Sequence, residues 1–202
     1  MQDINELVFP INDTPFGLSY NDWSAKWWKW ILQIPKDINP LFDLEGKNAH
    51  LNQIHDNVFF LCQTVESSEK IPHRTIRIPK QSAIFMPVIN WVSVLHEDGE
   101  SDEELLRVAR ERMDVVKDLL IFINDIALTT DILKKFRTES PFIDLFLPEN
   151  NIFDYHGGQT RIISDGYWIF LKPVSDNIKI KSSGSCSSGI TKIGVHYNID
   201  VY

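Results

Sequence analysis

The chain has 202 residues, of which 43% are hydrophobic and 24% are charged, and its formal net charge is −8 at pH 7. This length suffices for one sizeable core and is short for two, so we expect a single domain over residues 1–202. The acidic balance argues against a nucleic-acid partner, because phosphate backbones are bound by clustered Lys and Arg side chains.

The sequence also argues against a membrane span and a secretion signal. The most apolar run, residues 83–95, is shorter than the roughly 20 apolar residues that a span requires and contains Pro87. The first ten residues are acidic where a secretion signal would be basic. Two cysteines, Cys62 and Cys186, allow one disulfide without implying it. We therefore expect free thiols in a soluble, cytoplasmic protein.

The strongest local pattern is a tryptophan-rich helix at residues 20–34, within the stretch SYNDWSAKWWKWILQIP. Trp23, Trp27 and Trp30 recur at helical spacing along one stripe, and lysines occupy the opposite side. The serine before this stretch can cap the helix, and the proline after it marks the end. Three indoles are expected to face the core, while Trp28 lies slightly off the stripe.

A second helix is expected at residues 101–118. Ser101 and Glu104 have the spacing of a capping box. Leu105, Ala109 and Met113 follow at four-residue intervals and form one apolar face.

The remaining chain is typical of short strands joined by turns. Asp165-Gly166 is a strong two-residue hairpin signal, and the serine-rich run at 181–189 resembles a flexible connection. Residues 35–57 have an irregular, loop-like composition. Strands are expected at residues 6–9, 58–62, 74–78, 83–87 with a continuation towards 95, 119–123 and a return strand after Asn124-Asp125, 142–147, 161–164, 167–171, 178–181 and 193–201.

These elements predict a mainly β protein, α+β by content. The short connections between C-terminal strands indicate antiparallel pairing. We therefore expect an antiparallel β-sandwich, jelly-roll-like, with the two amphipathic helices at about 20–34 and 101–118 packed on it.

No catalytic or metal motif emerges from the sequence. The six histidines are dispersed, no HExxH spacing occurs, and no cofactor is indicated. The run at 184–189 has glycines flanking Ser and Cys, but a flexible turn is not the strand-to-helix setting of a nucleophile elbow. A hydrolase that uses loop carboxylates or a histidine stays open, with these acids to consider: Asp43, Glu45, Asp56, Asp154 and Asp165.

Aromatic residues are the remaining signal for a binding site. Aromatic faces stack on sugars and other flat ligands, while amides and carboxylates bind hydroxyl groups. Aromatics beside polar neighbours are therefore the candidates, and the alternative is that these aromatics fill the core. The candidate ligand-binding residues are Asn90, Trp91, Asp154, His156, Asp165, Tyr167 and Trp168.

Three phrases in order carry a resemblance: GLSYNDWSAKWWKWILQIP at 17–35, IPxxxAIFMPVIN at 78–90 and SDGYWIFLKPV at 164–174. The chain resembles a family of uncharacterised microbial proteins, often secreted, with no known activity. That resemblance supports one domain and supplies no catalytic residues. Members often carry cysteines where this chain has Ile76 and His50 or its neighbours, a departure that favours the cytoplasmic location.

Three functions follow as hypotheses. The first is a non-enzymatic binding or interaction protein whose ligand is a carbohydrate, another small molecule or a protein. The second is the hydrolase. The third is a structural component whose edge strands pair with other copies. A pocket with paired carboxylates would favour the hydrolase, and aromatic groups around a pocket without such pairs would favour binding.

Overall fold

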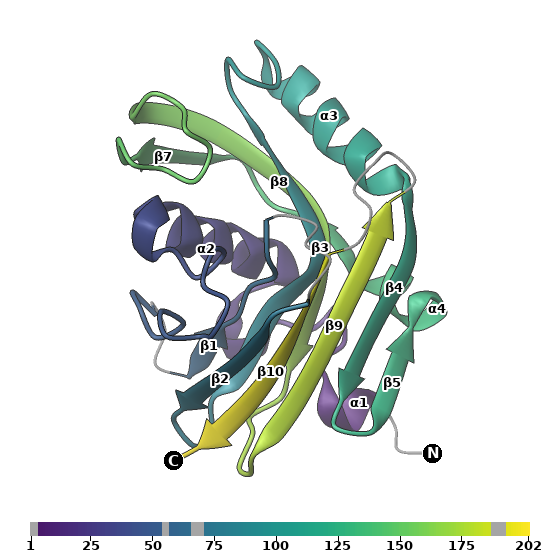
Figure 1. The fold of residues 1–202 in the computed structure, drawn as a ribbon. Coiled ribbons are helices and arrows are strands. Elements are labelled where there is room, and N and C mark those ends of the chain that lie inside the picture. Colours follow the sequence, from purple (N-terminus) through teal and green to yellow (C-terminus); the bar gives the residue numbers. More distant parts are fainter. Residues whose placement is uncertain (1–3, 54–56, 66–70, 187–192) are drawn as a thin grey trace.

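The computed structural model describes residues 4–53, 57–65, 71–186 and 193–202. These residues form a mainly β structure of two mixed sheets that pack together without closing into a barrel (Figure 1). The predicted β-rich architecture with two packed helices is therefore confirmed. The expectation of antiparallel pairing throughout is wrong, since each sheet contains one parallel pair.

The first sheet has the order β1-β3-β8-β6, with β7 also paired to β8. Its only described parallel pair joins β1 to β3, which are separated in sequence by a strand of the other sheet. Such a crossover permits parallel pairing because no short turn fixes the strand direction. The bounds are β1 (Val58–Phe60), β3 (Ala83–Val94), β6 (Arg137–Glu139), β7 (Ile143–Leu147) and β8 (Gly158–Leu171).

The second sheet has the order β2-β10-β9-β4-β5. Here β2 and β10 run parallel, and the hairpin β4–β5 around Asn124-Asp125 forms as predicted. One hydrophobic cluster includes inward-facing residues of both sheets and of the tryptophan helix. The bounds are β2 (His73–Ile78), β4 (Val116–Ile123), β5 (Ile126–Thr129), β9 (Ile178–Cys186) and β10 (Ile193–Val201).

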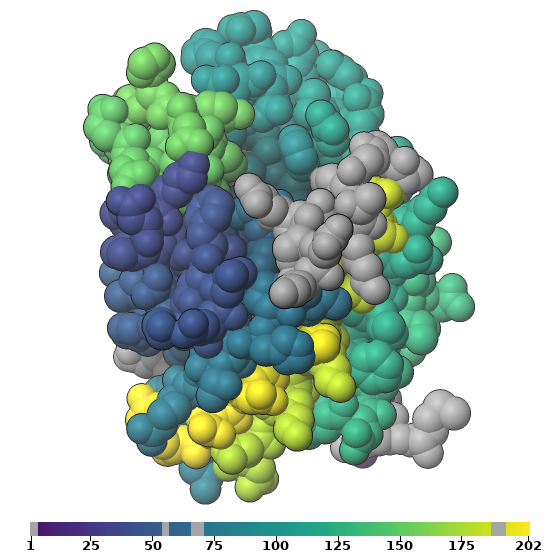
Figure 2. Space-filling view, viewed as in Figure 1, coloured from purple at the N-terminus to yellow at the C-terminus, as the bar shows by residue number. Residues whose placement is uncertain are grey.

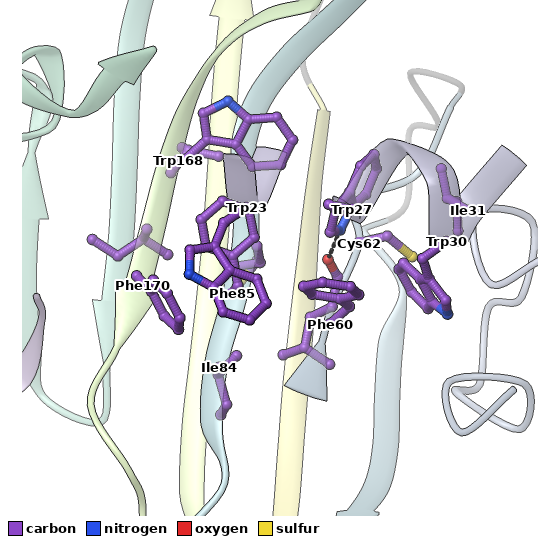
Figure 3. Packing of buried hydrophobic residues seen from close by; sticks show 14 of the residues in the cluster. Trp23, Trp27, Trp30, Ile31, Phe60, Cys62, Ile84, Phe85, Trp168 and Phe170 are labelled. Carbon is purple, nitrogen blue, oxygen red and sulfur yellow. Dashed lines mark hydrogen bonds between the residues drawn. The ribbon is translucent and has the colours of Figure 1, made fainter. Parts of the chain in front are cut away.

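The tryptophan helix, α2 (Tyr20–Leu32), packs on the first sheet (Figures 1 and 3). Ser19 caps it with the reciprocal bonds to Asp22 that the sequence indicates. Trp23 packs edge-on against Phe170 at 5.4 Å between ring centroids, and Trp27 packs edge-on against Trp168. The helix therefore anchors an aromatic core, as predicted.

The three indoles of the predicted stripe each donate a hydrogen bond to a backbone carbonyl. Trp23 Nε1 donates to Pro15 O at 3.0 Å, and Trp27 Nε1 donates to Leu61 O at 2.8 Å (the dashed line in Figure 3). Trp30 Nε1 donates to a carbonyl of the irregular 35–57 segment at 2.8 Å. Because buried donors need partners, these bonds fix where the surrounding segments lie.

The second predicted helix, α3 (Asp102–Asp114), lies along β3 and β8 (Figure 1). It ends four residues earlier than predicted, because the chain turns directly into β4. Ser101 accepts the Glu104 N–H at 3.3 Å, as expected of the cap. In a capping box the Glu104 carboxylate would accept from the backbone N–H of Ser101. Here it accepts from Glu100 N at 2.7 Å, one residue earlier in the chain.

Three predictions of local structure, one strand and two turns or connections, differ from the structure. Of the strand predicted at 6–9, the first two residues belong to a short helix, α1 (Ile4–Leu7), whereas Val8 forms an isolated antiparallel bridge with Leu171 and Phe9 N donates to Phe170 O at 2.9 Å. The serine-rich run is strand as far as Cys186, and its last residues, 187–189, lie outside the described residues. Asp165-Gly166 is no hairpin but the middle of β8, because Gly166 opposes Asn90 so closely that a Cβ there would lie 2.6 Å from Asn90 Cβ.

β3 also passes through Pro87 without breaking. A register shift between Pro87 and Ile89 takes up the irregularity that the sequence predicts as a bend. The short helices are η1 (Pro15–Gly17), η2 (Lys36–Ile38), α4 (Thr130–Leu133) and η3 (Lys134–Phe136).

The irregular 35–57 segment is held to the second sheet by Arg74, whose side chain is 1% exposed. Its guanidinium donates to Asp43 O at 2.7 Å, Cys62 O at 2.8 Å and Tyr197 Oη at 2.7 Å. Burial raises the pKa of the Tyr197 hydroxyl and of the Cys62 thiol, so both stay neutral. The Arg74 guanidinium is thus held by backbone carbonyls and a neutral hydroxyl. No described carboxylate forms an ion pair with it.

Candidate functional site

A partly open cavity of about 210 Å³ lies where β1 separates from β3. The two strands pair as far as Phe60 and Phe85, and Leu61 N then donates to Phe85 O at 3.1 Å. Beyond that point the Gln63 side-chain amide donates to Pro87 O at 3.3 Å and Val88 O at 3.1 Å. The cavity lies beyond this point, beside the edge of β3 that no longer pairs with β1.

The walls come from segments far apart in the sequence. One wall is α2 with the 151–155 segment, another is the second half of β3, and a third is the end of α3. Figure 2 shows the light-green segment around residue 150 above the dark-blue segment around residue 40 and beside the teal region of α3. The described lining is mainly apolar and includes Trp27, Trp28, Leu41, Gln63, Ile89, Asn90, Trp91, Val92, Val94, Asp98, Met113, Ile152, Phe153 and Tyr155.

Four of these lining residues carry buried polar atoms without a partner in the described part of the chain. They are the indole Nε1 atoms of Trp28 and Trp91, the amide Nδ2 of Asn90 and the amide Oε1 of Gln63. The Trp28 and Gln63 residues are 6% and 3% exposed. Buried polar groups in native proteins are nearly always bonded, so a cluster of four beside one cavity requires a physical explanation.

The orientation of the Gln63 amide follows from its bonds. Its nitrogen donates to the two β3 carbonyls and to Ser182 Oγ at 2.6 Å, which leaves the oxygen as a free acceptor. The residues that line the cavity therefore carry three unpartnered donors and one unpartnered acceptor in a mainly apolar setting. That combination suits an uncharged group with both a carbonyl and an N–H or O–H.

The described lining carries a single charged residue, an aspartate, and an arginine packs on the outer face of a lining tryptophan. Asp98 is the charged residue among the described lining, and its Oδ2 accepts from Val94 N at 2.8 Å. Burial, followed by the nearby Asp98 and Glu97, raises the pKa of the Tyr155 hydroxyl, which therefore stays protonated at neutral pH. The Arg112 guanidinium lies 4.5 Å from the Trp91 ring centre and covers that face of the indole.

The structure brings two of the seven predicted site residues, Asn90 and Trp91, to this cavity. Trp168 is fully buried instead and stacks on Phe85 at 5.1 Å. Tyr167 is also buried, with the Arg137 guanidinium 5.9 Å from its ring centre.

Asp165 is buried in an ion pair with Arg137, whose Nη2 lies 2.6 Å from the carboxylate. Burial raises the pKa of the Asp165 carboxyl, and Arg137 offsets this only in part. This pair, with Asp114, connects α3 to β6 and β8.

The predicted loop residues lie at the surface. Asp154 pairs with Lys36, and His156 is exposed. Asp43 accepts backbone N–H groups of its own loop, such as Asn48 N at 2.7 Å. Asp56 lies outside the described residues. No pair of the proposed loop carboxylates lines the cavity among the residues that the structure places.

Within the described ranges, no group of three or more His, Cys, Asp or Glu residues could hold a metal ion, and no helix is both long and apolar enough to cross a membrane. Both cysteines are unpaired, as predicted. Comparison with family models, curated proteins and solved structures found no match, so the resemblance above stays a prediction.

Sequence reasoning missed most of the cavity wall. Gln63, Phe153 and Tyr155 carry no local signal, since only the fold brings them beside β3. Trp28 did carry a local signal, because its position off the helical stripe sets it apart from the three core-facing tryptophans of the same helix. It is buried, but its indole N–H is directed to no described partner.

Proposed function

We propose that this protein is a non-enzymatic binding protein whose ligand occupies the cavity beside β3. The observation that carries the proposal is the cluster of four unpartnered polar atoms on its lining residues. Each such group costs about 1–3 kcal/mol while it lacks a partner. A ligand that bonds to them removes this cost on binding, which favours the bound state.

The lining also supports a ligand class. Its area is mostly apolar, and its polar groups match an amide-like or hydroxyl-bearing group rather than an anion. The volume of about 210 Å³ exceeds the roughly 150 Å³ of an engineered cavity that binds benzene. We therefore propose a small, mainly apolar, uncharged binding group with one polar end.

The hydrolase is less well supported. General acid–base chemistry needs a second titratable group near the first, as in a carboxylate pair or a histidine beside a carboxylate. The described lining holds Asp98 without a second carboxylate or a histidine. The jelly-roll-like topology, the carbohydrate ligand, the assembly role and the cytoplasmic location stay predictions.

The test uses the indole N–H signals as reporters. In ¹H–¹⁵N spectra, titration with benzamide, a neutral aromatic amide, should shift the signals of Trp28 and Trp91. The signals of Trp23 and Trp30, which are already bonded, should stay in place. Glucose serves as the carbohydrate arm, and we expect it to shift neither pair.

A filled cavity gives the matched control. Val92→Phe adds bulk to a lining position, whereas Val201→Phe makes the same change at the end of β10, away from the cavity. We expect benzamide to shift the two indole signals in the Val201 variant and in the wild type but not in the Val92 variant. Equal shifts in both variants, or none in the wild type at saturating benzamide, would refute the proposal.

A further inference from the structure

The cavity borders backbone groups as well as side chains. The edge of β3 that faces it runs from Ile89 to Val94, and the lining includes most of these residues. Because the N–H and C=O groups of successive strand residues point alternately to the two sides, the direction of each group follows from one known bond.

Two bonds fix this alternation. Leu95 N donates to Arg161 O at 2.9 Å, so Leu95 directs its backbone groups towards β8. On the far side of β8, Ser140 N donates to Ser164 O at 2.8 Å, so Ser164 directs its carbonyl away from β3. Ser164 is the register partner of Val92. Val92, and Asn90 two residues before it, therefore direct their N–H and C=O groups away from β8, to the cavity edge.

Both ends of this edge are occupied. Before it, Gln63 bonds to the carbonyls of Pro87 and Val88. After it, Val94 N donates to Asp98 Oδ2, and Asp98 N donates to Val94 O at 2.9 Å. Between these points, no residue in the described ranges bonds to the outward backbone groups of Asn90 and Val92.

A strand edge whose backbone groups are unpaired can accept another strand. A row of unpaired N–H and C=O groups is the template on which extended peptides add to a sheet. The side chains beside it carry groups of the same chemistry, since the Gln63 oxygen is an unpartnered acceptor and the Trp28 and Asn90 nitrogens are unpartnered donors, as a peptide N–H and C=O require. Side chains and backbone thus offer complementary bonds to one kind of molecule.

We propose that the ligand of this cavity is an extended peptide segment that pairs with β3 at residues 90–92. This inference rests on the proposed function and names its ligand class. One large apolar side chain of the peptide enters the cavity, against Val94, Met113 and Phe153. Asp98 at the lining and the net charge of −8 favour a neutral or basic segment over an acidic one.

The first experiment selects seven-residue peptides from a displayed random library on the wild-type protein, with counter-selection on Val92→Phe. We expect enriched peptides with one large apolar residue near the centre and few acidic residues. One enriched peptide is then synthesised and N-methylated at one backbone position at a time. Each methyl group removes a single N–H and leaves the side chains unchanged.

The pattern of affinities distinguishes strand pairing from side-chain contact. A paired strand uses every second N–H, so methylation should weaken binding about tenfold or more at alternate positions and little between them. Equal tolerance at all positions would overturn strand pairing. Uniform loss at all positions would also overturn it, because the alternation would be absent.

A protein variant tests the same bond from the other side. Val92→Pro removes the N–H that points away from β8. The hydrogen bonds to β8 are made by the neighbouring residues, Trp91 and Ser93, and are therefore kept. We expect this variant to lose peptide binding about tenfold and to keep the benzamide-induced shift of the Trp28 signal. If it unfolds, the N-methyl series still decides.

The failure of this inference differs from the failure of the proposed function. Benzamide binding without any enriched peptide would refute the peptide ligand and leave the small-ligand proposal standing. The absence of both would refute both.

Discussion

Two groups of tryptophans in one structure have opposite hydrogen-bonding states. Trp23, Trp27 and Trp30 on α2 bury their rings in the aromatic core, and each indole N–H donates to a backbone carbonyl. Trp28 and Trp91 border the cavity, and their N–H groups have no partner in the described part of the chain. The same residue type therefore has its N–H bonded in the core and unpartnered at Trp28 and Trp91, although Trp27 also lines the cavity.

Burial alone does not make this distinction. Trp168 also has an unpartnered indole N–H, but it is enclosed by the core and does not line the cavity. Trp28 and Trp91 differ because they adjoin open volume together with Asn90 and Gln63. Unpartnered groups that cluster beside a cavity are thus better evidence of a ligand than a single orphan in a core.

The largest expected effect is the loss of stability when a bonded tryptophan of α2 is removed from the aromatic core. Trp23→Ala should lower the free energy of unfolding by about 3–5 kcal/mol, because it removes a fully buried ring from the aromatic core. Denaturant unfolding measures the loss. Benzamide binding should persist, since Trp23 does not line the cavity. A loss below about 1 kcal/mol would contradict the anchoring role of α2.

Arg74→Met should cost about 2–4 kcal/mol. The substitution keeps much of the side-chain bulk but removes the Arg74 bonds to Asp43 O, Cys62 O and Tyr197 Oη. Cys62 O keeps the Tyr197 hydroxyl as a donor at 2.8 Å, whereas no other described donor bonds to Asp43 O. Arg77→Met on the same strand is the control, since Arg77 is exposed, and it should change stability by no more than about 0.5 kcal/mol. Equal effects in thermal or denaturant unfolding would show that the buried bonds contribute little.

Gly166→Ala should cost about 1–3 kcal/mol and disturb the cavity, because the new Cβ would lie 2.6 Å from Asn90 Cβ. The double variant with Asn90→Gly removes that contact. We therefore expect it to recover part of the stability, as a coupling in a double-mutant cycle. Additive losses would mean that the close approach of the two strands is not the cause.

The smallest effect is expected for Trp28→Phe, within about 1 kcal/mol of the wild type, because the lost N–H has no described partner. Trp27→Phe is the matched control and should cost more, since it leaves Leu61 O without its donor. For binding the order reverses, and the Trp28 variant should lose more affinity for benzamide. A greater loss of stability in the Trp28 variant would contradict the comparison.

Local pattern was enough to predict the helices. Periodic tryptophans and the Ser19 cap specify α2 to within two residues, because both signals act within a few turns of chain. The end of α3 was placed too late because Val116 continues the apolar spacing of the helix, although it begins β4. Asp165-Gly166 has the residues of a turn, but close packing against Asn90 is what requires the glycine.

The sheets and the site depend on distant residues. Parallel pairing of β2 with β10 joins segments more than a hundred residues apart, and no local signal specifies it. Asn90 and Trp91 were identified because a polar residue adjoins an aromatic one within an apolar run. Gln63 and Tyr155 could not be identified from the sequence, because they become part of a site only where separate segments meet around the cavity.

Amide hydrogen exchange along β3 tests most directly the claim that this edge is left open for a ligand. Trp91 and Ser93, whose N–H groups bond to β8, should be protected, whereas Asn90 and Val92 should exchange much faster in the free protein. An enriched peptide should slow exchange at Asn90 and Val92 and leave the other two unchanged. Equal protection of all four amides in the free protein would contradict the account.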